Sequence, residues 1–106
     1  NNIIVNSVNH GYDAEGFLAA LPGERIAYIH VAGHYDEAED LKDDTHGADV
    51  SAPVWTLLES AYRRFGPRPT LLERDFNFPP FEVLAAELGE VRSRLGRAAS
   101  RRREAA

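Results

Sequence analysis

Three short stretches decide the fold of this 106-residue chain: IHVAGH at residues 29–34, DTHG at residues 44–47 and TLLERD at residues 70–75. The first and the last begin as apolar runs, which are typical of buried strands, and turn polar where those strands should end. In folds that alternate strands with helices, functional residues gather at the carboxyl ends of the strands, so we expect these polar residues at one mouth of a sheet or barrel. They are His30, Asp44, His46 and Glu73.

These four side chains suit a metal ion. Histidine, aspartate and glutamate together form a ligand set for iron, manganese or zinc. Asp44 and His46 are two residues apart, so in an extended segment they point the same way and can face one ion. Each residue also has a purely structural alternative. His30 could be a hydrogen-bonded core histidine, Asp44 and His46 could shape a turn, and Glu73 could pair with Arg74.

Composition narrows the class of protein. The chain has no cysteine, which excludes disulfides and thiolate metal sites. No apolar run approaches the roughly 18 residues that cross a bilayer, and no secretory signal is evident, so we predict a cytoplasmic protein without membrane partners. The net charge is −5, with acids concentrated at residues 36–49 and arginines at residues 92–103. Because no aromatic residues interleave with those arginines, nucleic-acid binding is not expected.

The first half of the chain predicts two strands and a helix. Apolar residues near the start indicate a strand over residues 1–7. Asp13 is a plausible helix cap, and Phe17, Leu18 and Leu21 would form the buried face of a helix. A nearly continuous apolar run over residues 25–31 suits a strand buried on both faces. The segment 33–50 predicts a long loop, mobile in its acidic middle and anchored near His46.

The second half predicts a helix, a strand and a last helix. Ser51 and Pro53 mark a helix start, apolar residues recur at helical spacing from Val54, and Gly66 marks the end. A strand over residues 70–72 follows, then a helix from Pro79 whose apolar face is Phe81, Val83, Leu84, Leu88, Val91 and Leu95. Residues 96–106 are polar and arginine-rich, which favours a frayed helical tail.

The alternation of strands and helices indicates an α/β fold with a parallel sheet. Three such units cannot close a barrel, and the chain starts inside an apolar segment without a methionine. We therefore expect residues 1–95 to be part of a larger domain. No nucleophile elbow and no phosphate-binding glycine loop is evident, so a metal centre is the chemistry that the sequence favours.

Several motifs, taken in order, resemble the C-terminal part of one protein family. They are NNIIVNSVNHG at residues 1–11, IHVAGH at 29–34, DTHG at 44–47, PVW at 53–55 and PTLLERD at 69–75. The family is the multinuclear non-heme iron-dependent oxidative enzymes, also called domain of unknown function 692. The similarity covers about residues 1–90. It implies the C-terminal portion of a TIM-type (β/α)8 barrel, similar to xylose isomerase, in which residues 1–11 form a loop after a strand.

The resemblance also implies an activity. Family members hold two or three irons at the barrel mouth and use oxygen to modify cysteine residues of ribosomally made precursor peptides, often with a partner protein that delivers the peptide. By motif, His30, Asp44, His46 and Glu73 are similar to iron ligands, and Asn2 to a further ligand or a residue beside one. Residues that would line the site or contact substrate are Asn6, His10, His34 and Asp75.

The missing N-terminal part of the barrel would supply the other ligands, so this chain alone is expected to be inactive. Judged from the residues alone, without the resemblance, two other functions are also possible. The first is a different metal-dependent enzyme on the same barrel, either an isomerase or an endonuclease-like protein. The second is a non-catalytic metal-binding module that uses the acidic loop.

Overall fold

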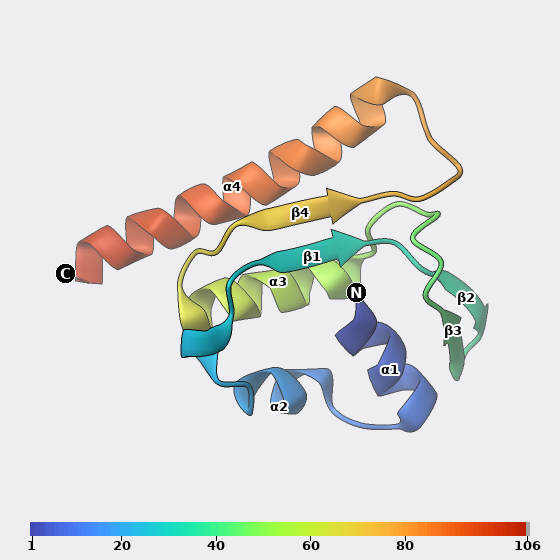
Figure 1. The fold of residues 1–106 in the computed structure, drawn as a ribbon, viewed down its shortest axis with the longest axis horizontal. Helices are drawn as coiled ribbons and strands as arrows, with labels where there is room; N and C mark the ends of the chain where they lie inside the picture. The colour runs from blue at the N-terminus through green and yellow to red at the C-terminus, as the bar shows by residue number, and fades with distance from the viewer. Residues whose placement is uncertain (106) are drawn as a thin grey trace.

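A computed structural model of the chain describes residues 1–105 as a mixed α/β fold. In chain order its elements are α1 (Asn2–His10), α2 (Ala14–Ala19), the 3₁₀ turn η1 (Gly23–Arg25), β1 (Ile29–Ala32), β2 (Tyr35–Ala38), β3 (Leu41–Asp43), α3 (Ala52–Phe65), β4 (Thr70–Glu73) and α4 (Phe81–Ala105). Strands β1 and β4 lie side by side with their arrowheads toward the same end, where the amino end of α1 and the loops also lie (Figure 1).

The pairing of β1 with β4 is parallel, as the sequence predicts, and its register runs from Ile29 opposite Thr70 to Ala32 opposite Glu73. These are two strands rather than a closed sheet, and residues 1–105 contain no barrel. β1 is shorter than the strand expected over residues 25–31: a 3₁₀ turn ends at Arg25 and the strand begins only at Ile29. It is also not buried on both faces, because His30 is exposed and Tyr28 just before the strand is 61% exposed.

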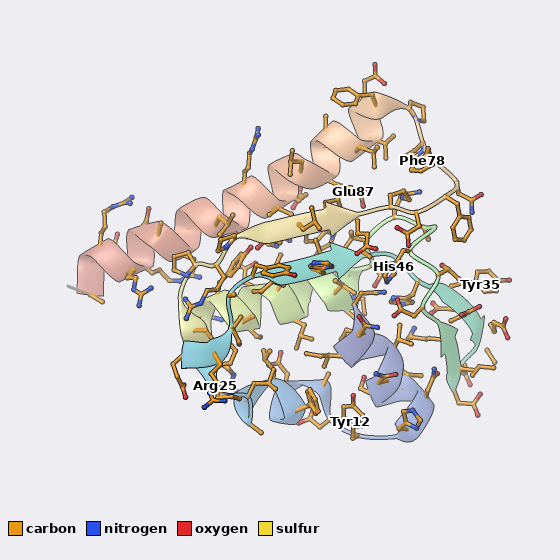
Figure 2. The ribbon with its side chains drawn as sticks, in the orientation of Figure 1. Tyr12, Arg25, Tyr35, His46, Phe78 and Glu87 are labelled. Atoms are coloured by element: carbon orange, nitrogen blue, oxygen red, sulfur yellow. The ribbon has the colours of Figure 1, made fainter. Side chains whose placement is uncertain are left out.

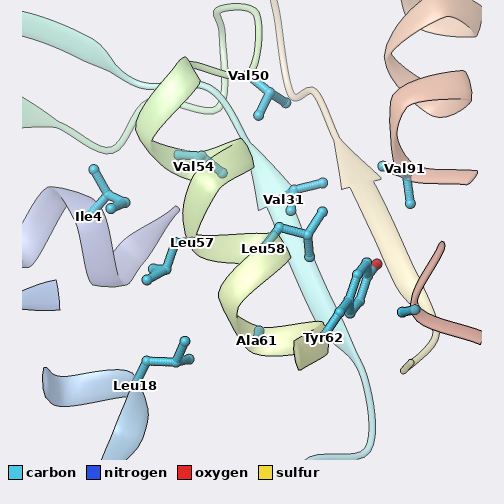
Figure 3. Close-up of a cluster of buried hydrophobic side chains, with 11 residues drawn as sticks. Ile4, Leu18, Val31, Val50, Val54, Leu57, Leu58, Ala61, Tyr62 and Val91 are labelled. Carbon is cyan, nitrogen blue, oxygen red and sulfur yellow. The ribbon is translucent and has the colours of Figure 1, made fainter. Parts of the chain in front are cut away.

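Helix α3 supplies the largest part of the core, and its prediction is confirmed. Ser51 occupies the N-cap position, but its hydroxyl makes no capping hydrogen bond. The helix has a proline in its first turn, and at its end Gly66 takes a φ of 82°, which glycine adopts without steric cost. The predicted apolar stripe is buried against β1 and the other helices (Figure 3). The buried side chains of α3 in this cluster are Val54, Leu57, Leu58, Ala61 and Tyr62.

The first segment is a helix, so both the strand and the loop predicted for it are wrong. Isoleucine and valine in residues 3–5 mimic a strand, but Ile4 joins the hydrophobic core, and such packing outweighs weak helix propensity. Gly11 ends α1 in the left-handed region, with φ at 70° and its N–H donating to the carbonyl of Ser7. Asn9 then docks α1 on β3, exchanging hydrogen bonds of 2.7 and 2.8 Å with the backbone of Lys42.

The segment expected to be one long loop contains a hairpin. Strands β2 and β3 pair antiparallel, with Tyr35 opposite Asp43 and an irregularity between Asp36 and Ala38. The residues of β2 are exposed, so the hairpin is held by backbone pairing and by Asn9 rather than by burial. The expected anchor near His46 is confirmed, since the N–H of His46 donates to the carbonyl of Gly33 at 3.2 Å.

Two apolar faces differ from expectation. Phe17, a predicted buried residue of α2, is instead 45% exposed: its ring lies outside the core cluster, 5.4 Å between centroids from the ring of Tyr12, which is itself exposed. In α4, Val91 is buried as predicted, whereas Phe81 is 78% exposed and Leu88 is also exposed. Helix α4 continues through the arginine-rich segment to Ala105. Within residues 1–105, no helix is both long and apolar enough to cross a membrane.

Candidate metal centre

Four of the predicted site residues, His30, Asp44, His46 and Glu73, meet near the carboxyl end of β4. His30 is the second residue of β1 rather than its last, and Figure 2 shows the place of His46 in the fold. His46 lies in the segment between β3 and α3, and its backbone joins the loops that follow the two strands. Its N–H donates to Gly33 at 3.2 Å, and its carbonyl accepts from the N–H of Asp75 at 2.8 Å. Its φ of 55° is uncommon for a residue other than glycine, and such conformations often occur at functional sites.

The His46 imidazole faces carboxylates on both of its nitrogens. Nδ1 lies 3.1 Å from Glu73 Oε1 and 3.3 Å from Asp75 Oδ2, while Nε2 lies 2.8 Å from Asp44 Oδ1. The other carboxylate oxygen of Glu73 lies 3.0 Å from His30 Nδ1. The four residues singled out in the sequence are therefore in one connected group: Glu73 is hydrogen-bonded to both histidines, and Asp44 forms an ion-pair contact with His46.

Three of these side chains offer atoms close enough to share one cation. One ligand atom each from His46, Glu73 and Asp75 lies within 4.8 Å of the others. Asp75, which the sequence places in the lining, therefore lies close enough to share an ion with His46 and Glu73. One imidazole and two carboxylates form a donor set that suits iron or manganese, and the absence of cysteine leaves no softer ligand in the chain. The residues fit a divalent metal ion.

The contacts around His46 shift the pKa values of His46 and of Glu73 in opposite directions. Burial lowers the pKa of His46, but attraction to Asp44 and Glu73 and a hydrogen bond to Glu73 outweigh it, so that pKa is raised. Desolvation raises the pKa of Glu73, but hydrogen bonds from His30 and His46 outweigh it and that pKa is lowered. The neighbouring carboxylates therefore favour the protonated form of His46, and a metal ion bound to the imidazole would compete with that proton.

Two asparagines at the start of α1 hold the Asp44 carboxylate. The amide nitrogen of Asn1 donates to Asp44 Oδ1, and that of Asn2 donates to Oδ2. Asn2 thus lies beside a candidate ligand, as expected. Asn1 is not among the predicted site residues, because the sequence predicts a strand or a loop over its segment rather than a helix whose amino end lies at Asp44.

His34 contacts the side chain of Asn1, and its own side chain is almost fully buried. Its Nδ1 lies 2.8 Å from Asn1 Oδ1. Burial, followed by repulsion from Lys42, lowers the pKa of His34. The residue therefore contacts the site through Asn1, rather than lining it directly.

Asn6 and His10 are not in the hydrogen-bonded group that the structure places around His46. Both are exposed on α1. His10 ends this helix, roughly 13 Å along its axis from Asn1 at about 1.5 Å per residue. Their predicted role in lining the site stays a prediction.

Comparison with known proteins gives a family for the chain. Residues 1–95 match the family described as "RiPP precursor modification enzyme MbnB/TglH/ChrH", where RiPP denotes a ribosomally synthesised and post-translationally modified peptide. A UPF0276 protein of Alcanivorax borkumensis is 64% identical over 91 residues, which are 86% of this chain and 30% of that protein. A UPF0276 protein of Shewanella oneidensis is 56% identical over 100 residues, or 94% and 36% of the two chains. The chain spans about a third of the length of the curated relatives it matches. No solved structure matches it significantly.

Proposed function

The chain belongs to the family of RiPP precursor modification enzymes MbnB/TglH/ChrH, and from this premise we propose that the intact protein is an iron-dependent oxidative enzyme. Membership in the family implies a ribosomally made precursor peptide as substrate. The proposed reaction modifies cysteine residues of that peptide and uses oxygen. A second protein that delivers the peptide is part of the proposal.

One observation carries the proposal: His46 contacts three carboxylates, those of Glu73 and Asp75 at the end of β4 and that of Asp44 just after β3. His46, Glu73 and Asp75 would hold iron, together with Asp44 and His30, which contact them. Glu73 directs one oxygen toward each histidine, so both of its oxygens would be available as ligands for the proposed iron centre. When bound, iron supplies the one-electron chemistry with oxygen that amino-acid side chains lack.

The chain's own residues orient and balance this centre. The asparagines fix the Asp44 carboxylate, and the main-chain bonds of His46 hold the loops after β1 and β4 together. Preorganised donors of this kind need little rearrangement when a ligand binds. Because the chain spans about a third of its relatives, we propose that the N-terminal remainder of a TIM barrel covers the open face of β1 and β4 and adds further ligands. Residues 1–106 alone would then be inactive.

The test measures iron in the intact protein, in the variant His46→Ala and in the matched control His10→Ala. Wild type and the His10 control should bind iron equally, while the His46 variant should lose most of it. A full iron complement in His46→Ala would refute the assignment of the site.

Oxygen consumption with a cysteine-containing precursor peptide tests the reaction. Iron binding without peptide-dependent oxygen uptake would instead favour another metal-dependent enzyme of the barrel type, an isomerase or an endonuclease. Absence of any stoichiometric transition metal in wild type would favour a non-catalytic module.

A further inference from the structure

We propose that His34 is a positioning residue of the metal centre, and that it acts on the Asp44 carboxylate through the side chain of Asn1. The inference rests on the proposed function, because it takes Asp44 as part of the metal-binding group. His34 itself does not touch that group directly.

A continuous set of contacts connects His34 to His46. His34 Nδ1 lies 2.8 Å from Asn1 Oδ1. The Asn1 amide nitrogen donates to Asp44 Oδ1 and, at 3.3 Å, to the carbonyl of Gly33. Asp44 Oδ1 lies 2.8 Å from His46 Nε2. The segment after β1, the start of α1 and the segment after β3 are therefore joined by side chains that each have a specific partner.

The identity of the partners fixes the direction of every hydrogen bond in this set. A carboxylate and a backbone carbonyl only accept hydrogen bonds, so the atom of Asn1 that faces both must be its nitrogen. The oxygen of the same amide then faces His34, which must donate from Nδ1. His34 consequently holds the Asn1 amide in the one orientation that gives Asp44 a donor, because the flipped amide would turn its oxygen toward two acceptors.

The consequence for the metal centre is a fixed carboxylate. Asn1 and Asn2 each hold one oxygen of Asp44, so its carboxylate is oriented before any ion arrives. Groups that orient metal ligands in this way typically change metal affinity by 10-fold to 100-fold when they are removed. His34 supports one of the two donors and should therefore influence iron binding.

The other nitrogen of His34 supplies a built-in control. Nε2 lies 3.5 Å from Asp36 Oδ1, which is longer than an ordinary hydrogen bond, and Asp36 pairs instead with Lys42 on the exposed hairpin. Asparagine can place an amide nitrogen near the position of histidine Nδ1, whereas the longer glutamine side chain reaches the position of Nε2. His34→Asn and His34→Gln thus separate the two contacts with almost the same chemistry.

The experiment compares Fe(II) dissociation constants, measured anaerobically by chelator competition, for the intact wild-type protein, His34→Asn, His34→Gln and His34→Leu. We expect His34→Asn to bind iron within about threefold of wild type, and His34→Gln and His34→Leu to bind about tenfold or more weakly. Because His34 is buried, Asn1→Ala provides a second route that leaves the core unchanged. It should weaken iron binding to a similar extent, and adding His34→Gln to it should weaken binding no further.

The outcomes separate this inference from the proposed function. If wild type binds iron and the asparagine and glutamine variants bind it equally well, the relay through Asn1 is wrong while the iron site stands. Additive losses from Asn1→Ala and His34→Gln would also overturn it, since residues acting in one relay cannot contribute independently. If wild type binds no iron, both the proposed function and this inference fail.

Discussion

Replacing Gly33 with alanine should lower the free energy of unfolding more than the same change at Gly47, the other glycine between β1 and α3. A methyl group at this position would lie 1.9 Å from the carbonyl oxygen of Ala48 and 2.4 Å from its carbon. These are backbone atoms, so no side-chain rotation relieves the clash and the two segments must separate. The glycine is needed for this close approach of two backbones.

The size of the effect follows from what the separation breaks. Overpacking typically costs about 1–3 kcal/mol. The carbonyl of Gly33 also accepts from His46 N–H and from the Asn1 amide, and losing two such hydrogen bonds costs roughly 1 kcal/mol each. We therefore expect Gly33→Ala to lower the free energy of unfolding by about 3–5 kcal/mol. Because both donors belong to the candidate metal centre, iron binding should weaken as well.

The matched control is Gly89→Ala in α4, where an added methyl group meets nothing within 4 Å. That change should stabilise the helix by up to about 1 kcal/mol, the usual difference between glycine and alanine in a helix. Urea unfolding of the intact protein measures both variants, and the midpoint for Gly33→Ala should fall by about 1 M or more at ordinary slopes. A Gly33→Ala midpoint equal to that of wild type would show that the close approach does not exist.

Further predictions concern the core and the ionisation of the site. Leu58→Ala, a change in the buried face of α3, should cost about 2–5 kcal/mol, whereas Leu41→Ala on the exposed hairpin should cost less than about 1 kcal/mol in the same urea assay. In the metal-free protein, NMR titration should find the pKa of His46 above its usual value near 6.5, and Asp44→Asn should lower it by removing an attractive charge. Because that pKa is raised by folding, its stabilising contribution is complete below about pH 6.5 and is lost as the pH rises through the folded-state pKa, so Glu73→Gln should weaken this pH dependence.

The elements with strong local signals were predictable from sequence. Four local signals favour helix α3: a serine before it, a proline in its first turn, apolar residues at helical spacing and a glycine at its end. The structure contains this helix. The parallel pairing of β1 and β4 was likewise expected, since a helix connects two short apolar runs. Glu73 and the three residues grouped with it could be predicted from sequence as one site, because parallel strands place their carboxyl ends at the same edge of a sheet.

The missed features depend on contacts between segments distant in sequence. The β-branched residues at 3–5 favour a strand locally, and only the burial of Ile4 and the pairing of Asn9 with β3 reveal a helix. The hairpin β2–β3 has exposed, acidic strands, so it lacks the alternation of apolar residues by which strands are recognised. Asn1 could not be identified before α1 was known, since its role depends on which way that helix points.

The same contacts between distant segments imply that metal binding at the candidate centre depends on backbone hydrogen bonds as well as on the ligand side chains. His46 reaches three carboxylates only because its main chain is tied to Gly33 on one side and to Asp75 on the other. Its unfavourable φ costs on the order of 1 kcal/mol, and two hydrogen bonds of similar individual strength can offset it. A metal ion that binds these ligands would therefore also clamp the loops after β1 and β4, so stability and metal affinity should change together across variants of this site.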